Sequence, residues 1–498
     1  MSKVKYRTSR TSLSILIFCL LTSASLFSAA CVSKATHPNL PRSFPAQNPL
    51  TPKSKNPVIL IPGVLGSALV NRRTGDKVWP GLFVSDADTM ALPIASTNFA
   101  ENTDELVATE ILETVKFGRL LPEISVYDSL LTALERYGGY RRGNLDAPND
   151  DGDHDTFYVF AYDWRRDNVE SAALLAQKIT ALKQKLGKPD LRFDIVAHSM
   201  GGLVARYYAM YGGRDVLKAA APKPDWSGAR HLNKLIMLGT PNAGSMDALR
   251  TLVLGYSITE TNRLRISLLN KLNREMIFTS PSAYELLPRN ASARFIDARL
   301  APLQVDLLDP ETWKKYKWSA AFNVTLERAA RRTLQKEQGA DSVAGATKQL
   351  AAEREQFLRA ALARAAAFHR ALDATSALPD SLRLYLFGGD CEATLDAALL
   401  ITDKKTGELQ TLFQTARVIG NSETQRKAFN AMFAPGDGRV TRRSLFGIKL
   451  EPDAETSQLR AMKQKPFQAT FDCELHGDLP LNLRIQNNLL TMLLGNSY

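Results

Sequence analysis

The chain of 498 residues has few cysteines and histidines and lacks a long apolar segment. It contains four cysteines and six histidines, and none of them has the spacing of a zinc site. Basic residues exceed acidic ones by 12, but no stretch interleaves basic with aromatic side chains, which argues against nucleic-acid binding. No internal repeat is evident. These absences exclude a zinc protein, a nucleic-acid-binding protein and a repeat protein, and they leave an ordinary globular chain.

The N-terminus has the features of an export signal. Residues 1–30 carry four basic residues, the apolar run LSILIFCLL and then small residues. The run is too short to span a bilayer, which favours a cleaved signal over a retained membrane anchor. Two processing routes fit: ordinary cleavage after Ser28-Ala29-Ala30, or a bacterial lipoprotein site at which Cys31 is acylated.

We therefore expect an exported protein, in the bacterial periplasm or as an outer-membrane lipoprotein, with the cell surface as a further location. Loss of the first 30 residues, which hold no acidic residue, leaves 59 basic residues against 51 acidic ones. This mild positive excess favours an anionic membrane surface as a partner.

Short apolar runs alternate with amphipathic segments after the Pro-rich residues 31–55, which we interpret as a tether. The runs are PVILIPG, TFYVFAYDW, RFDIVAHS, LNKLIMLGTP, LRLYLFGGD and FQATFDCELHG. Runs that are apolar throughout are typical of strands buried on both faces of a sheet, and helical segments between them connect parallel strands. The sequence predicts an α/β fold with a mostly parallel, doubly wound sheet.

Residues 246–375 break this alternation. The first part carries mixed helical patterns, and residues 323–375 are rich in Ala, Arg, Glu and Gln. We interpret the whole as a large inserted cap or lid over the edge where the strands end; a solvated helical hairpin is the alternative for its second part. The predicted core then consists of residues 56–245 and 376–498.

A serine follows the third apolar run, in Ala197-His198-Ser199-Met200-Gly201. The usual nucleophile elbow reads Gly-x-Ser-x-Gly, and here Ala replaces the first Gly. A strand that turns directly into a helix exposes the residue at the turn. We therefore predict that Ser199 is a nucleophile; a structural turn is the alternative.

An activated serine needs a base and a carboxylate that orients the base. In α/β hydrolases the acid and then the histidine follow the serine along the chain. Of the three histidines after Ser199, His231 precedes a strand, His369 lies in the helical insertion, and His476 lies in a loop after the last strand. His476 is the predicted base.

The predicted acid is Asp437, which lies between two glycines ahead of His476. Asp390 also follows a strand and is the rival. The oxyanion hole needs two backbone N–H groups, and we expect them from Val64, after the first strand, and from Met200, after the nucleophile.

Six segments in this order resemble the lecithin:cholesterol acyltransferase family: NPVILIPGVLGSAL, VWPG, AYDWRRD, AHSMGG, LGTPNAGS and GDGRV. The family includes lysosomal phospholipase relatives and many bacterial members, to which this chain is similar. The resemblance implies an α/β-hydrolase core with a cap and lid. It also implies a Ser–Asp–His triad that moves an acyl chain from a lipid ester to water or an alcohol.

Residue by residue, the resemblance places the nucleophile on Ser199, the acid on Asp437 and the oxyanion donors on Val64 and Met200. The histidine departs from the mammalian pattern, in which it lies a few residues beyond a Leu-His-Gly-like string. Here that position is near the proline of GDLPLN, and only His476 is available.

Three aromatic residues are candidates for the substrate pocket. Tyr162 and Trp164 follow a strand in AYDWRRD, and Trp79 lies in VWPG. We expect them to line an acyl pocket, with Asp163 and Arg165 paired beneath it; packing around the elbow is the alternative for all three.

Cys391 and Cys473 each follow a predicted strand. The two strands should be neighbours at one sheet edge, so a disulfide between these cysteines is geometrically reasonable. In an exported protein this bridge would join the loops that carry the predicted acid and base.

These residues favour a serine acyl hydrolase or O-acyltransferase that cleaves or transfers acyl chains of phospholipid-like esters through an acyl-enzyme. Its partners would be a lipid ester and a membrane surface, and it requires no metal and no organic cofactor. Two alternatives remain open: an esterase or peptidase for soluble substrates on the same triad, and a catalytically silent surface lipoprotein that binds lipid or a partner.

Overall fold

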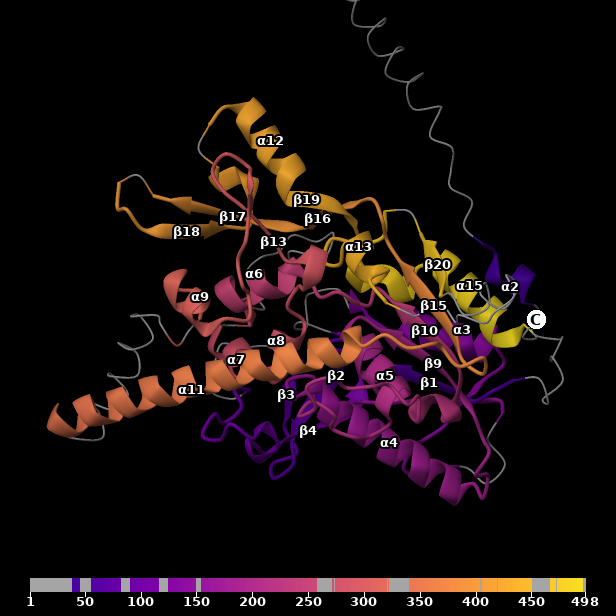
Figure 1. Ribbon diagram of the computed structural model, residues 1–498. Coiled ribbons are helices and arrows are strands. Elements are labelled where there is room, and N and C mark those ends of the chain that lie inside the picture. The colour runs from indigo at the N-terminus through magenta and orange to yellow at the C-terminus, as the bar shows by residue number, and fades with distance from the viewer. Residues whose placement is uncertain are drawn as a thin grey trace, which may run out of the picture. The chain divides into compact units, whose positions relative to one another are not determined.

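The computed structural model describes most of the chain from residue 38 onward (Figure 1). The described ranges are 38–44, 55–81, 90–115, 124–148, 154–257, 271–272, 274–319, 321, 340–403, 405–418, 420–449, 466–471 and 473–495. The predicted export signal and Cys31 lie outside them. All helices and strands below belong to the unit Leu40–Tyr498.

A seven-stranded sheet forms the centre of this unit, and every pair of neighbouring strands in it is parallel. Its order is β20 (Phe467–Thr470), β15 (Arg383–Gly388), β10 (Leu232–Leu238), β9 (Phe193–His198), β1 (Val58–Ile61), β8 (Thr156–Val159) and β7 (Arg141–Arg142). Six of these strands are the six apolar runs of the sequence, so the predicted parallel sheet is confirmed. The two-residue strand β7 carries no apolar run and was not predicted.

Helices cover both faces of this sheet. Side chains of β1 alternate between two hydrophobic clusters, with Ile59 and Ile61 in one and Val58 and Leu60 in the other, because successive strand residues point to opposite faces. The first cluster includes α4 (Asn168–Lys185) and α5 (Met200–Tyr211), and the second includes α3 (Asp128–Arg136) and α15 (Leu483–Leu494) (Figure 1). This is the doubly wound, three-layer arrangement that the sequence predicts.

Smaller elements surround the ends of the sheet. An antiparallel sheet contains β3 (Lys77–Trp79), β2 (Ser67–Asn71) and β4 (Leu106–Ile111), and β5 (Thr114–Val115) pairs with β6 (Ile124–Ser125). The predicted cap region contains α6 (Met246–Leu254), β11 (Tyr256–Ser257), β12 (Lys271–Leu272), α7 (Arg274–Phe278), α8 (Pro281–Glu285), α9 (Pro310–Lys315) and α11 (Ala340–Asp373). In Figure 1, α11 runs past α8 and α7.

The second part of the cap differs from a solvated helical hairpin. Its described part is one helix, α11, whose C-terminal half is buried through Phe357, Leu362 and Phe368. The composition of this segment is polar overall and did not indicate this burial. Its apolar residues nevertheless recur at helical spacing among alanines and arginines, and so they form one buried face.

A second sheet joins the cap region to the later part of the chain. Strands β14 (Pro302–Leu303) and β13 (Arg294–Ile296) continue into β17 (Ala397–Thr402) and β18 (Leu409–Leu412). Nearby lie β16 (Glu392–Leu395), α12 (Ser422–Met432), β19 (Phe433–Gly436) and α13 (Arg442–Leu445) (Figure 1). The segment between β15 and Asp437 therefore adds strands to this second sheet, outside the main sheet. The chain then returns to the main sheet at β20.

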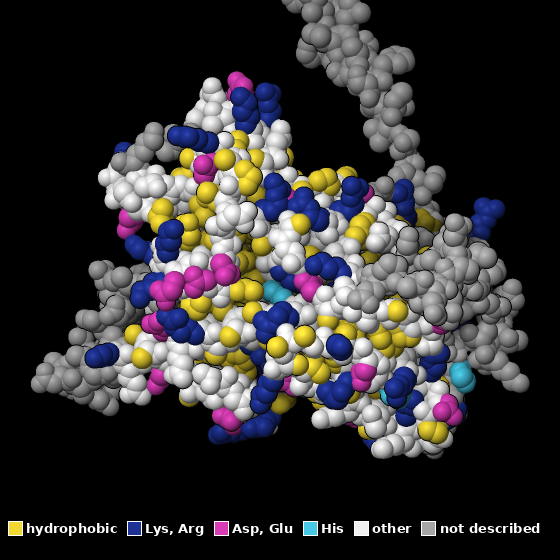
Figure 2. Space-filling model, in the orientation of Figure 1, with side chains coloured by type: hydrophobic (Ala, Val, Ile, Leu, Met, Phe, Trp, Pro, Cys, Tyr) yellow, Lys and Arg dark blue, Asp and Glu magenta, His cyan; other side chains and the backbone are white. Residues whose placement is uncertain are grey.

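Two surface properties bear on partners. Among the described helices, none is long and apolar enough to cross a membrane. On the face shown in Figure 2, Lys and Arg side chains are interspersed with acidic and hydrophobic ones rather than gathered in one patch.

Candidate active site

Ser199 lies at the sharp turn between β9 and α5. Its φ of 53° and ψ of −126° place a non-glycine residue in a strained conformation, and its N–H donates to the carbonyl of Leu238 over 2.8 Å. The turn needs the two glycines that follow. A Cβ on Gly201 would lie 2.3 Å from the carbonyl oxygen of Pro62, and one on Gly202 would lie 1.9 Å from Oγ1 of Thr240.

The structure brings Ser199, His476 and Asp437 together at the ends of three different strands. Nε2 of His476 lies 2.8 Å from Oγ of Ser199, and Nδ1 lies 2.8 Å from Oδ2 of Asp437. Because an ionised carboxylate only accepts, Nδ1 carries the hydrogen and Nε2 is left to accept the proton of Ser199. This is the hydrogen-bonding pattern of a general base that activates a hydroxyl.

Asp437 is buried, and its second carboxylate oxygen is also satisfied. The amides of Arg439 and Val440 donate to Oδ1 over 3.0 and 2.7 Å. The amide of His476 donates to the carbonyl of Asp437 over 2.8 Å. The loops of the acid and the base are therefore fixed to each other by backbone as well as side-chain contacts.

The rival residues lie elsewhere. Asp390 accepts from Oγ1 of Thr470 at 2.7 Å. His231 precedes β10 at the opposite end of the sheet, where Nζ of Lys183 lies 2.9 Å from its Nδ1. His369 is buried in α11, with Nε2 3.0 Å from the carbonyl oxygen of Glu285. None of these contacts involves Ser199.

The two expected oxyanion donors flank Ser199. Met200 is the first residue of α5, where backbone N–H groups have no partner within the helix. Val64 lies in the loop after β1, and a Cβ on the preceding Gly63 would lie 2.8 Å from Cβ of Ser199. Among the described residues, neither the Val64 nor the Met200 amide donates a hydrogen bond. Both are thus free to bind an oxygen atom beside Ser199.

A cavity of about 250 Å³ opens beside Ser199 and His476. Most of its wall is apolar. Residues from the β1–β6 segment, the loop of Trp164, the cap helices and the loops of Asp437 and His476 contribute to it. The apolar lining includes Trp79, Leu112, Val115, Ile124, Trp164, Leu272, Met276, Ile277 and Leu286.

Of the three aromatic candidates, Trp79 and Trp164 border this cavity and Tyr162 does not. The two indoles meet edge to face at 6.0 Å and donate to the backbone carbonyls of Leu65 and Ser67. Tyr162 fits the packing alternative: its ring is buried, and its hydroxyl donates to the carbonyl of Pro62 over 3.1 Å. Tyr162 therefore supports the oxyanion loop from beneath.

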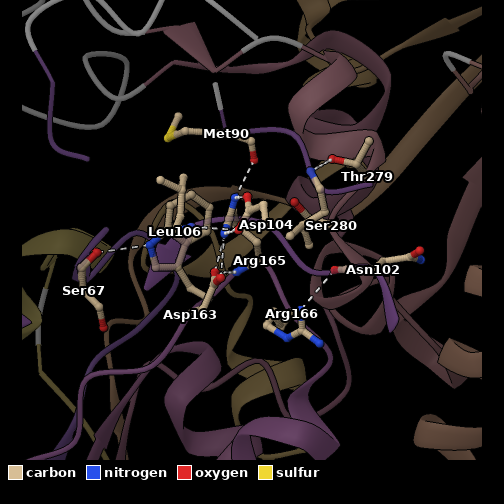
Figure 3. Close-up of polar contacts among 12 residues, drawn as sticks. Ser67, Met90, Asn102, Asp104, Leu106, Asp163, Arg165, Arg166, Thr279 and Ser280 are labelled. Atoms are coloured by element: carbon tan, nitrogen blue, oxygen red, sulfur yellow. Dashed lines mark hydrogen bonds and ion pairs between the residues drawn. The ribbon is translucent and has the colours of Figure 1, made fainter. Parts of the chain in front are cut away.

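Arg165 pairs with Asp163, as expected, and also with Asp104 (Figure 3). Its side chain is fully buried and also donates to the carbonyl of Met90. Burial alone would lower the pKa of Arg165, but the hydrogen bonds and charges of the two aspartates outweigh it and raise the pKa. This cluster anchors the segment before β4 against the loop of Trp164; nothing in the sequence distinguished Asp104 from other surface aspartates.

A second buried ion pair, between Arg439 and Asp247, borders the cavity and was not predicted. The guanidinium of Arg439 also lies 4.5 Å from the ring of Tyr256. Burial opposes ionisation of Asp247, yet the charges of Arg439 and Arg250 lower its pKa. The pair fixes the acid-bearing loop to the start of α6; the only sequence signal was the presence of Arg439 in GDGRV.

Cys391 and Cys473 form a disulfide, with Cα atoms 4.8 Å apart. Glu392, which follows Cys391, forms a backbone β-bridge with Asp437. Cys473 lies three residues before His476. The bond therefore lies beside both loops. Among the described residues, no group of three or more histidine, cysteine or acidic side chains could hold a metal ion.

Comparison with known proteins identifies the family. The lecithin:cholesterol acyltransferase family profile matches residues 107–367, more than half of the chain. The protein belongs to the lecithin:cholesterol acyltransferase family. The matched range includes Ser199 but neither Asp437 nor His476, so the assignment of the last two depends on the geometry above.

This family member is distantly similar to the following three proteins. Lecithin-cholesterol acyltransferase-like 4 of Arabidopsis thaliana is 25% identical over 185 residues, and the match spans about a third of each protein, 32% of both. A chain in the crystal structure of the Tle4–Tli4 complex has a TM-score of 0.52 at 14% identity, over 89% of this chain and 99% of that one. Lipase 1 from Pelosinus fermentans has a TM-score of 0.32 at 12% identity, over 89% of this chain and all of that one. The family and the parallel sheet together define an α/β-hydrolase fold.

Proposed function

We propose that the protein is a serine acyl hydrolase or O-acyltransferase that acts on lipid esters through an acyl-enzyme on Ser199. The observation that carries this proposal is the continuous hydrogen-bonded arrangement of Ser199, His476 and Asp437 at the wall of an apolar cavity. The lecithin:cholesterol acyltransferase family and the hydrolase fold support the same class of reaction.

In this proposal Ser199 attacks the ester carbonyl while His476 accepts its proton. Asp437 holds His476 in the productive tautomer and stabilises the imidazolium that forms. The amides of Val64 and Met200 donate to the oxyanion of the tetrahedral intermediate. The protonated His476 then gives its proton to the leaving alcohol, and water or an acceptor alcohol releases the acyl group by the reverse sequence.

The apolar wall supports a substrate with a hydrocarbon chain. Trp79, Trp164 and the cap residues Met276 and Ile277 border the cavity, and burying apolar surface favours binding by about 25 cal/mol per Å². We propose that the acyl chain lies against this wall with its carbonyl carbon at Ser199. We also propose that the protein is exported and acts at a membrane surface, with Cys31 as the site of lipid attachment.

Product analysis on phospholipid vesicles tests this function. The purified protein is incubated with and without a long-chain alcohol or sterol, beside Ser199→Ala and a control, Ser292→Ala. Ser292 is a buried serine with no hydrogen-bond partner for its hydroxyl among the described residues. Fatty acid that depends on Ser199 supports a lipase or phospholipase, and new ester supports an acyltransferase.

Failure to form either product would contradict the lipid proposal. Hydrolysis of short soluble esters alone would then indicate a soluble esterase, and inactivity on both would indicate a binding protein. Mass analysis of the protein from the native cell tests the location separately: an N-terminal, acylated Cys31 is expected, and an intact N-terminus would contradict export.

A further inference from the structure

A chain of hydrogen bonds runs from the loop beside Ser199 to the backbone of His476. The amide of Gly63 donates to Oη of Tyr127 over 2.9 Å, and this oxygen lies 2.7 Å from Nδ1 of His198. On the other side of the same imidazole, Nε2 lies 3.1 Å from the carbonyl oxygen of His476. Through Tyr127, His198 connects the segment that carries Val64 with the segment that carries the base.

The hydrogens of this chain have one consistent arrangement. A carbonyl oxygen only accepts, so Nε2 of His198 carries a hydrogen and donates to His476. Burial, together with the charge of His476, lowers the pKa of His198 to about 3. The ring is therefore neutral at pH 7, and Nδ1 is an acceptor.

The hydroxyl of Tyr127 must then donate to Nδ1 of His198, and its oxygen accepts from Gly63. Burial raises the pKa of Tyr127 above its ordinary value, so the hydroxyl keeps its hydrogen. Each bond is polarised by the next because all hydrogens point in one direction. Loss of any member leaves a buried donor or acceptor without a partner, which costs more than the bond itself contributes.

The loop at residues 62–66 packs directly against this chain. A Cβ on Gly63 would lie 3.3 Å from Nδ1 of His198, and one on Gly66 would lie 3.2 Å from Oη of Tyr127. The bond donated by Gly63 therefore fixes the peptide that immediately precedes the amide of Val64. An oxyanion donor is effective only within hydrogen-bonding distance of the developing charge, so this fixation matters for chemistry.

We propose that Tyr127 and His198 are positioning residues that hold the Val64 amide and His476 in one fixed geometry. This inference rests on the proposed function, because it concerns the oxyanion donor and the base of that reaction. Both side chains border the cavity, but they act through Gly63 and the backbone of His476. Their loss should weaken transition-state binding more than substrate binding, and so lower kcat more than it raises KM.

The substitution Tyr127→Phe removes a single oxygen atom and tests this directly. On a soluble ester, kcat should fall about 10- to 100-fold, less than the roughly 10²- to 10³-fold cost of losing an oxyanion donor outright, and KM should change less than about threefold. The matched control is Tyr140→Phe, at a buried tyrosine whose hydroxyl has no hydrogen-bond partner among the described residues. It should leave kcat unchanged.

A second variant, His198→Phe, keeps a ring at this position and removes both the acceptor for Tyr127 and the donor for the His476 carbonyl. It should show a similar loss in kcat, and the double variant should lose no more than the more severely affected single variant, because both substitutions break one chain. An unchanged kcat in Tyr127→Phe, or losses that multiply in the double variant, would overturn the proposal. Should Tyr127→Phe fail to fold, an unchanged kcat in His198→Phe would overturn it.

Ser199→Ala in the same assay separates the two proposals. Ester hydrolysis that persists at the wild-type rate in Ser199→Ala would overturn the proposed function. Serine-dependent hydrolysis that Tyr127→Phe leaves unchanged would overturn only the positioning role.

Discussion

Nε2 of His476 lies 2.8 Å from Oγ of Ser199, although 277 residues separate them in the chain. The parallel sheet makes this contact, because the carboxyl ends of its strands meet at one edge and the two residues follow β20 and β9. The cap and the second sheet are inserted between these strands without separating the two residues, and helices of the cap add to the cavity wall. The arrangement leads to five predictions.

The substitution Asp437→Asn should lower kcat about 10⁴-fold, because an amide no longer holds His476 in the tautomer that accepts from Ser199. The control is Asp390→Asn, at the rival carboxylate that accepts from Thr470. It should leave turnover within a few-fold of wild type. A severe loss in Asp390→Asn with activity retained in Asp437→Asn would reverse the assignment.

The pairing of Arg165 with Asp163 and Asp104 should be important for stability. Arg165→Ala leaves two largely buried carboxylates without their partner, which typically costs about 3–5 kcal/mol. Urea denaturation followed by tryptophan fluorescence measures the change. Arg73→Ala removes an arginine whose side chain is 74% exposed and should leave the urea midpoint unchanged; equal shifts for both variants would contradict the role of burial.

Replacing Cys391 and Cys473 together by serine should lower the free energy of unfolding by about 2–4 kcal/mol, since the bond closes a loop of 82 residues. Urea denaturation of the wild type and the double variant measures the change in the free energy of unfolding. Titration of free thiols without reductant tests the pairing itself. Wild type and the double variant should give the same count. Two additional thiols in wild type would show that the cysteines are not paired.

Stability should depend on pH through His369. Burial, and then the charge of Arg289, lower its pKa from 6.5 to about 3. Above pH 6.5 the histidine is neutral in both states; below it the unfolded chain takes up a proton that the folded one does not. Stability is therefore lost as the pH falls from about 6.5 towards 3, by up to about 1.4 kcal/mol per pH unit.

The variant His369→Gln isolates this effect. Its free energy of unfolding should fall less steeply with acidification than that of wild type. The reference is pH 8, at which His369 of the wild type is neutral in both the folded and the unfolded state. Urea titrations at pH 8, 6 and 5 compare the two. Parallel pH dependences would mean that His369 takes up its proton equally in the folded and the unfolded state, and would contradict this prediction.

The sequence was most informative where one local pattern decided the structure. Apolar runs predicted six of the seven strands of the main sheet, and the small residues around Ser199 predicted its turn. The order of residue types also selected Asp437 and His476. In the structure His476 contacts Asp437 through one ring nitrogen and Ser199 through the other.

The parts that were missed depend on contacts between distant segments. The bond from Tyr127 to His198 and the bonds from Arg165 to Asp104 join residues 71 and 61 positions apart, and no local pattern marks either partner. Strands β13 and β17 pair across about a hundred residues, and each is short. For Tyr162 the sequence left cavity lining and packing open, because a position at a strand end does not reveal which way the ring points.

The most direct test of the account is to locate the adduct formed by a fluorophosphonate, which reacts with an activated serine. The folded and the urea-denatured protein are each treated, digested and mapped by mass spectrometry. We expect one adduct per chain, on Ser199, in the folded protein only, because His476 activates the hydroxyl only when the sheet brings the two together. An adduct on another serine, or no adduct in the folded protein, would contradict it.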